Sequence, residues 1–160
     1  MSNVAIIAEA ALKPKQLELV RQGLLAAKVD LEEFVIVYAV RSKQLAVGGP
    51  TTRTYRRPTT EELVAARSYL FDTLWDVDAR IGVLLGAGAA TCVRGREVAV
   101  TRILGEVIEA AHPHKDPLCK SILVIPSLHP VAFAAGPGTS EFYSFVKHLK
   151  TASDVLHDGN

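Results

Sequence analysis

The stretch Ser121–Ala134, SILVIPSLHPVAFA, decides the fold, because its first half has the composition of a buried strand and its second half that of a turn. β-Branched and aliphatic residues run up to Pro126 and predict a strand over Ile122–Ile125. The carboxyl ends of parallel strands open onto the ligand crevice of α/β folds, so His129 in the following turn is a candidate catalytic residue. A hydrogen-bonded structural histidine is the alternative, and loop position alone does not decide between the two.

The rest of the chain alternates between short apolar runs, which predict strands, and longer runs with apolar residues at helical spacing, which predict helices. Thr59-Thr60-Glu61-Glu62 has the pattern of a capping box and predicts the start of a helix that ends near Asp76. The segment 98–111 is compatible with a helix or with extended turns. The expected strands are Asn3–Ala8, Glu33–Val40, Arg80–Leu85 and Ile122–Ile125, and the other expected helices begin at Pro14, after Gly86 and at Thr139 or Ser140.

This alternation predicts an α/β fold, specifically a three-layer α/β/α sandwich with a four-stranded parallel sheet. Glu33–Val40 is apolar enough for a strand buried on both faces. At 160 residues, of which 49% are hydrophobic and 22% charged, residues 1–160 form a single domain that can bury a core without disulfides. The same composition excludes a disordered chain.

Segments that would direct the chain into or across a membrane are lacking in the sequence. No stretch is apolar for long enough to span a bilayer. The first residues, MSNVAIIAEAALK, have neither the basic lead nor the cleavage pattern of a signal peptide. We therefore expect an intracellular, cytoplasmic protein without a membrane partner.

Metal and nucleotide cofactors are not expected. Cys92 and Cys119 form no CxxC pair, so zinc or iron–sulfur ligation by cysteine is excluded. His112-Pro113-His114 offers two histidines, which make a poor metal site, and a proline-rich turn is the commoner explanation. Gly86-Ala87-Gly88 suggests a dinucleotide-binding turn, but Thr91 stands where a third small residue is needed, and close helix packing explains the glycines better.

A basic segment stands out in a chain whose net charge is only +1. It contains no acidic residue, and Gly48-Gly49-Pro50 marks it as a loop. Such a segment predicts a local anionic partner, and a solvated surface loop is the alternative. Its basic residues are Arg41, Lys43, Arg53, Arg56 and Arg57.

Three segments, in this order, resemble the uracil-DNA glycosylase superfamily, particularly its bacterial and archaeal iron–sulfur branch. Arg57-Pro58-Thr59-Thr60-Glu61-Glu62 is similar to the family's Arg-Pro-Thr-x-x-Glu stretch. The run 81–90, IGVLLGAGAA, resembles the family's central strand ending in Leu-Gly. Residues 104–109, followed by 125–130, resemble the segment that leads to the family's His-Pro turn.

The resemblance implies a role for the His129-Pro130 loop in the DNA minor groove, beside a flipped nucleotide whose departing uracil anion His129 would stabilise. The chain departs from the family elsewhere. Glu9 is kept from the first motif, but Lys15 stands near the position of an acid that orients water. Tyr38 replaces the base-reading asparagine of the pocket, and a phenol cannot imitate a bidentate amide. The aromatic residue that stacks on uracil and the cluster cysteines are also missing.

Three functions follow as hypotheses. The first is a DNA-binding accessory of replication or repair with little or no uracil excision, which binds through the basic segment. Pro130 and Phe133 either add a wedge into the minor groove or pack against the sheet. The second is a divergent glycosylase for another base, with His129 as leaving-group stabiliser and Glu9 or Asp78 orienting water. The third is a protein-interaction scaffold that uses Tyr55, Trp75 or the Phe142–Phe145 helix, although we expect these aromatic residues in the core.

Overall fold

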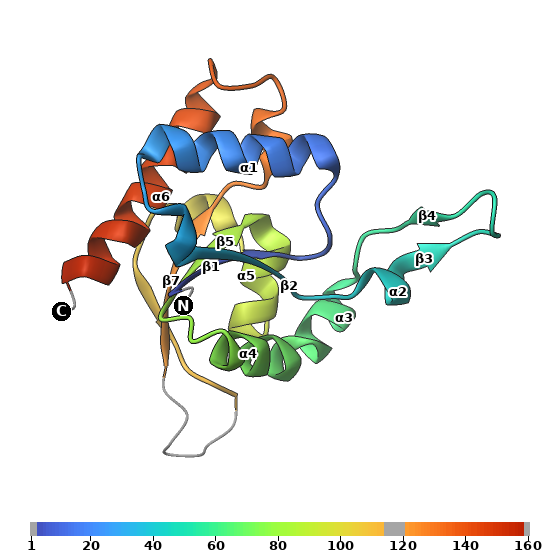
Figure 1. Ribbon diagram of the computed structural model, residues 1–160. Coiled ribbons are helices and arrows are strands. Elements are labelled where there is room, and N and C mark those ends of the chain that lie inside the picture. The colour runs from blue at the N-terminus through green and yellow to red at the C-terminus, as the bar shows by residue number, and fades with distance from the viewer. Residues whose placement is uncertain (1–2, 114–120, 159–160) are drawn as a thin grey trace.

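The computed structural model describes residues 3–113 and 121–158 and has an α/β architecture. A five-stranded sheet in the order β2-β1-β5-β7-β6 lies between two layers of helices (Figure 1). The strands of this sheet are β1 (Val4–Ala8), β2 (Phe34–Tyr38), β5 (Ile81–Leu85), β6 (Ile108–Ala110) and β7 (Ile122–Ser127).

The predicted α/β class is confirmed, but the prediction of a four-stranded, wholly parallel sheet is wrong. β2, β1, β5 and β7 are parallel to one another, and β6 adds a fifth strand, antiparallel to β7. β6 lies in the segment 98–111, which the sequence left undecided. Three residues are too short for any periodicity, so only pairing with β7 defines this strand.

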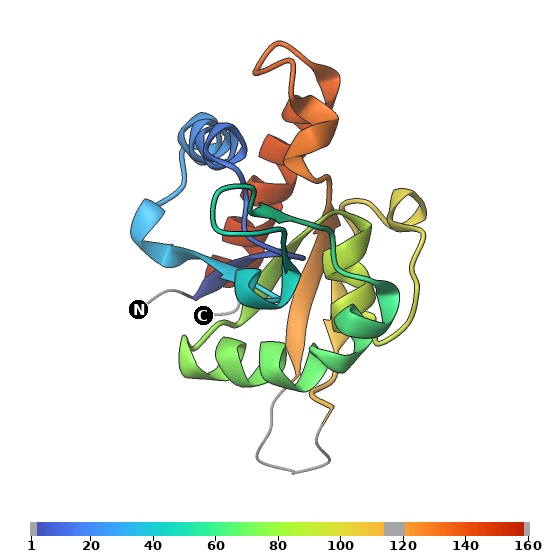
Figure 2. The ribbon, with the colours of Figure 1, turned by 90° about the vertical axis from the view of Figure 1, so that its right-hand side faces the viewer.

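The helices form one layer on each face of the sheet (Figure 2). α1 (Pro14–Ala27) and α6 (Ser140–Asp158) cover one face, where a Cβ added to Gly23 of α1 would lie 2.5 Å from the Phe145 ring of α6. This close approach explains a glycine inside a helix. α3 (Thr60–Ala65), α4 (Arg67–Asp76) and α5 (Gly86–Arg94) cover the other face.

The capping box is confirmed, but the single helix predicted to follow it is two helices. The Glu62 amide donates to Thr59 Oγ1 at 3.1 Å, and the Thr59 amide donates to Glu62 Oε1 at 3.0 Å. Ala66 ends α3 and begins α4, and its φ and ψ of −78° and −7° interrupt the helix. Arg67 donates from Nε to the Val93 carbonyl at 2.9 Å, which ties the start of α4 to α5.

β2 is an edge strand, so the expectation of a strand buried on both sides is wrong. Among the described strands it pairs with β1 alone, and Val37 is the buried one of its five residues. An apolar run indicates that side chains on both faces of the sheet are covered. It does not indicate how many neighbouring strands pair with the strand, so it does not distinguish a central strand from an edge strand.

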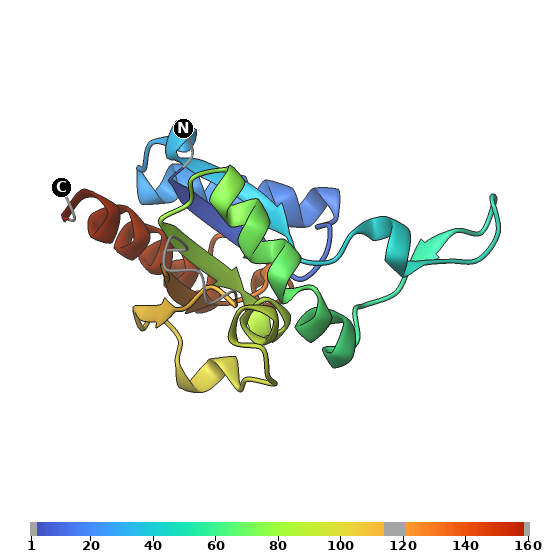
Figure 3. The ribbon, with the colours of Figure 1, turned by 90° about the horizontal axis from the view of Figure 1, so that it is seen from below.

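The basic segment forms an arm that projects from the body of the molecule (Figures 1 and 3). The helix α2 (Ser42–Leu45) leads into an antiparallel hairpin of β3 (Ala46–Val47) and β4 (Thr54–Tyr55). The short 3₁₀ helices of the chain are η1 (Leu31–Glu33), η2 (Val100–Arg102) and η3 (Pro130–Phe133). Among the described residues, no helix has the length and apolar character needed to cross a bilayer.

Candidate functional site

The candidate site lies at the carboxyl edge of the sheet, where the direction of strand addition reverses. The chain moves from β1 to β2 on one side and returns to β5 on the other side of β1. In open α/β sheets this switch point forms the ligand crevice. Glu9 follows β1, Gly86 follows β5, and His129 lies two residues after β7. The fold therefore brings these three segments to one edge.

Glu9 is a buried acid held from two sides. Its side chain is 10% exposed, and its two oxygens accept from Arg57 Nε at 3.1 Å and Nη2 at 3.3 Å. On the other side, a Cβ added to Gly88 would overlap Glu9 Oε2 and lie 2.8 Å from Cδ. The first turn of α5 therefore encloses the carboxylate. Both oxygens are engaged, which limits the capacity of Glu9 to orient a water molecule.

Gly86 brings the start of α5 against the His129 turn. Its φ is +87°, and a Cβ at this position would lie 2.9 Å from the Cβ of His129. Only glycine meets both requirements. The glycines of this turn thus allow α5 to pack closely against Glu9 and His129.

His129 has a defined tautomer. Its Nδ1 accepts a hydrogen bond from the Val131 amide at 3.1 Å, which caps η3, so the neutral ring carries its proton on Nε2. Burial lowers the pKa of His129, the negative charge of Glu9 raises it, and the positive charge of Arg57 lowers it. The net shift is downward and keeps the ring neutral at pH 7. His129 is therefore a neutral Nε2–H donor that can stabilise negative charge developing on a ligand.

A second histidine, His148 on α6, contacts the end of β7 just before the His129 turn. Ser127, fully buried at the end of β7, places its Oγ 2.6 Å from Nδ1 of His148 on α6. Burial lowers the pKa of His148. Gly105, with φ of +77°, lets the backbone approach closely to the same ring. This pair fixes the end of β7 to α6. Sequence reasoning missed it, although a serine directly before the turn and a histidine on the last amphipathic helix were visible signals.

Three of the five basic residues in the arm segment have partners within the molecule. Arg57 binds Glu9, and Arg56 donates to both oxygens of Glu62 at 2.6 and 3.0 Å. Arg41 stacks on Tyr69 with its guanidinium carbon 4.6 Å from the ring centroid, and its Nε donates to the Tyr69 hydroxyl at 3.2 Å.

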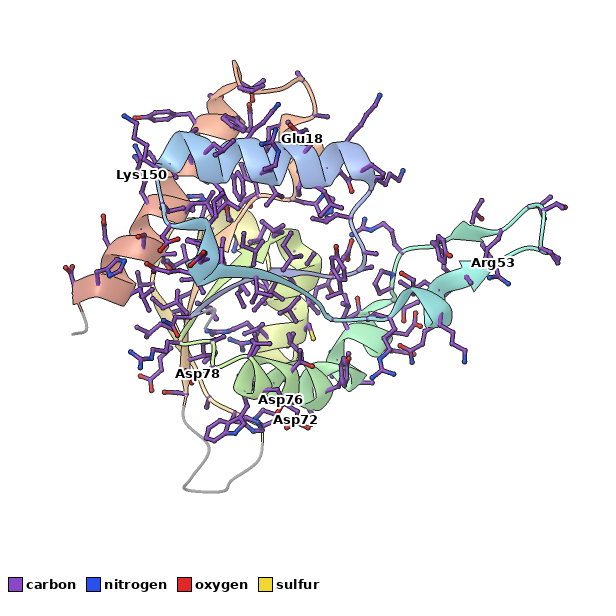
Figure 4. All side chains as sticks on the ribbon, in the orientation of Figure 1. Glu18, Arg53, Asp72, Asp76, Asp78 and Lys150 are labelled. Carbon is purple, nitrogen blue, oxygen red and sulfur yellow. The ribbon has the colours of Figure 1, made fainter. Side chains whose placement is uncertain are left out.

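Lys43 and Arg53 differ from these three. Within residues 3–113 and 121–158, no ion pair involves either of them. Lys43 lies on α2, and Arg53 lies in the loop that enters β4, exposed on the projecting arm (Figure 4). These two cations are the ones that the arm offers to an external anion.

The prediction that Pro130 and Phe133 form an exposed apolar wedge is wrong. Phe133 is 0% exposed and stacks on Phe145 with ring centroids 5.0 Å apart, and Pro130 is also buried. Val131, between them in η3, is 65% exposed. The large apolar side chain that this loop presents to a ligand is therefore Val131, because the 3₁₀ turn places Pro130 and Phe133 in the core.

Tyr38 and Asp78, the two other candidates, lie at different edges of the sheet. Tyr38 ends β2 opposite Ala8, and its side chain packs against the apolar layer under α1 and α6. Asp78 precedes β5, so it lies at the amino edge of the sheet, opposite the edge of Glu9 and His129 (Figure 4). Asp78 therefore cannot act as the water-orienting acid of the site.

The aromatic residues divide between surface and core. Tyr55 is 60% and Trp75 53% exposed, so the expectation that they lie in the core is wrong. Phe142 and Phe145 are buried as expected.

Metal-ligating side chains do not gather in the described part of the chain, where no group of three His, Cys, Asp or Glu residues could hold an ion. Cys92 is buried, which raises the pKa of its thiol to about 12 and leaves it unreactive. His112 packs edge-on against Phe71 and lies 3.5 Å from an Asp72 oxygen. His114 and Cys119 lie outside the described residues.

A scan of the chain against protein-family models found no matching family, and a search of curated proteins found no match. The function proposed for the chain therefore depends on the chemistry of the residues at its carboxyl edge and on its arm.

Proposed function

We propose that this protein is a DNA-binding accessory of replication or repair, with a uracil-DNA glycosylase-like fold and little or no uracil excision. The observation that carries the proposal is the ion pair between Arg57 and Glu9. It engages the acid that the family resemblance makes a candidate for water activation. It also ties the base of the basic arm to the sheet edge that carries His129.

Two observations support the loss of uracil excision. One is the set of contacts that Glu9 makes, and the other is the presence of Tyr38 at the base-reading position. A general base must reach a water molecule next to the reacting bond with an available oxygen. Both oxygens of Glu9 are hydrogen-bonded to Arg57, and Gly88 covers one of them. Tyr38, at the position of the uracil-reading asparagine, cannot supply the paired donor and acceptor of an amide.

DNA binding is supported by the charge and shape of the arm. Lys43 and Arg53 can neutralise backbone phosphates, and such contacts bind DNA without selecting a sequence. Exposed Val131 lies in the loop after β7, at the sheet edge from which the arm departs, and offers an apolar contact to a base or sugar. We therefore expect weak sequence preference and strong salt dependence.

A divergent glycosylase is the second candidate, favoured by one observation. His129 is a neutral Nε2–H donor, the form that can stabilise a base leaving as an anion. A base that is a better leaving group than uracil can be removed with less help from a water-activating acid.

The decisive experiment combines binding with base release. Purified protein is titrated into fluorescent single- and double-stranded oligonucleotides and followed by anisotropy. The same oligonucleotides, carrying uracil, hydroxymethyluracil, hypoxanthine or xanthine, are then tested for abasic sites. Binding without base release supports the accessory role. Release that is lost in His129→Ala would establish the glycosylase instead, and no binding at low salt would overturn both.

A further inference from the structure

In the described part of the chain, no strand pairs with the outer side of β2. The Ala39 amide donates to the Ala8 carbonyl at 2.9 Å, so the alternation along the strand directs the backbone groups of Val35 and Val37 toward β1. The N–H and C=O groups of Ile36 and Tyr38 and the C=O group of Phe34 therefore face outward, whereas the Phe34 amide donates to the Leu31 carbonyl of η1. β2 lies at the margin of the sheet, between α1 and α4 (Figures 1 and 2).

An apolar groove accompanies this edge on the side of α4. It has a volume of about 380 Å³, with Val35 and Val37 on one wall and, on the other, Tyr69 and Thr73 of α4 and Val77, which follows α4. The strand carries none of the devices that commonly block edge pairing, such as a lysine, a proline or a bulge. The edge thus has both free backbone groups and an apolar space beside them.

The sequence of β2 is close to symmetric about its centre. It reads Phe-Val-Ile-Val-Tyr, from Phe34 to Tyr38. In an antiparallel pair of two such strands centred on Ile36, Phe34 lies opposite Tyr38 and Val35 opposite Val37. The two Ile36 residues then form a hydrogen-bonded pair that exchanges both N–H···O bonds. Each Tyr38 amide donates to the Phe34 carbonyl of the other copy, while the Phe34 amide keeps its bond to Leu31. The valines of the second strand enter the groove beside α4.

Charge at the two ends of β2 also favours this arrangement. Asp30, Glu32 and Glu33 precede the strand, and Arg41 and Lys43 follow it. An antiparallel pair brings the acidic end of each strand beside the basic end of the other, whereas a parallel pair would bring like charges together.

We propose that two copies of this chain associate through β2, antiparallel about a twofold axis, to form one continuous sheet. The interface is isologous, since the same five residues contribute from each copy. It depends on the edge of β2 and not on the proposed DNA binding. An interface of one strand from each copy is small, so we expect a dimer that dissociates on dilution.

A charge swap tests the pairing. Sedimentation of the wild-type chain over a hundredfold range of concentration should show a reversible monomer–dimer equilibrium. Glu32→Arg and Arg41→Glu should each raise the dimer Kd by roughly tenfold, because each puts like charges together. The double variant should restore the wild-type Kd. Circular dichroism confirms that each variant is folded.

A disulfide test reports the register. In a Cys119→Ala background, Ile36→Cys should form an intermolecular disulfide, since directly opposed residues of a hydrogen-bonded pair lie about 5.5 Å apart. Glu109→Cys, on the opposite edge strand β6, is the matched control and should not cross-link. A monomer at every concentration, single charge variants with an unchanged Kd, a double variant that fails to recover, or equal cross-linking at position 109 would each overturn the proposal.

Discussion

Arg57 and Glu9, 48 residues apart in the sequence, form a two-pronged ion pair with N–O distances of 3.1 and 3.3 Å at the carboxyl edge of the sheet. The side chain of Glu9 is 10% exposed and that of Arg57 is 82% exposed. The pair therefore spans the boundary between the core and solvent. It fixes the arm to β1 and neutralises a buried charge.

Replacing Arg57 by Ala should destabilise the fold by about 1 kcal/mol, because it leaves a buried carboxylate without its cation, while solvent near the exposed arginine limits the loss. Urea unfolding measures the change. Arg53→Ala is the matched control, since Arg53 forms no ion pair in the described structure, and it should stay within about 0.5 kcal/mol of wild type. Equal effects of the two substitutions would refute the role of the pair.

Gly86→Ala should cost about 1–3 kcal/mol, since φ at this position is +87° and the new Cβ would lie 2.9 Å from His129. Gly138→Ala serves as the comparison. No atom lies within 4 Å of the Cβ it would add, so its stability should equal or slightly exceed that of wild type. Thermal unfolding of both variants distinguishes a conformational requirement from a general intolerance of alanine.

Ser127 and His148 should show a coupling free energy of about 1 kcal/mol, because removing either partner leaves the other buried without its hydrogen bond. A double-mutant cycle of Ser127→Ala, His148→Ala and the double variant, measured by urea unfolding, isolates this energy. Additive effects would show that the 2.6 Å hydrogen bond contributes nothing to stability.

Acid should weaken the fold through Glu62. Its pKa is lowered from 4.5 to about 2, first by the hydrogen bond from Arg56 and next by the Thr59 amide. A carboxyl group with a lower pKa in the folded state stabilises the fold above its unfolded pKa. The contribution is therefore complete above pH 4.5 and is lost as the pH falls toward 2. Glu62→Gln should flatten the stability profile in this window alone, and a profile with unchanged slope would contradict the assignment.

Lys43→Ala combined with Arg53→Ala should flatten the log–log salt dependence of duplex binding by about 1.8, because each phosphate that a lysine or arginine neutralises adds about 0.9 to the slope. Anisotropy titrations at several salt concentrations measure this slope. Lys28→Ala combined with Lys150→Ala, at the end of α1 and on α6, removes the same charge away from the arm and should leave the slope nearly unchanged. Identical slopes for both double variants would exclude the arm as the DNA-binding element.

Local patterns predicted most of the secondary structure. The apolar runs located β1, β5 and β7, and the Thr59–Glu62 box located the start of α3. The break at Ala66 left no such signal, because helical spacing of apolar residues continues through it.

These local patterns did not predict the interactions between segments that are distant in the sequence. By sequence, Arg57 was one of five basic residues expected to meet an anionic partner, and only the folded chain pairs it with Glu9. Phe133 fitted a wedge by sequence, but η3 turns it into the core and turns Val131 out. By sequence, Asp78 and Glu9 were both candidates for the acid that orients water. In the structure they lie at opposite edges of the sheet.

The sequence by itself determined the α/β class, four parallel strands and the His129 turn, because period, β-branching and capping act over a few residues. The tertiary structure alone decided that β2 is an edge, that β6 exists, and that Glu9, Gly86, Arg57 and His129 meet. These features depend on which strands become neighbours, and that is settled by packing between segments far apart in the chain.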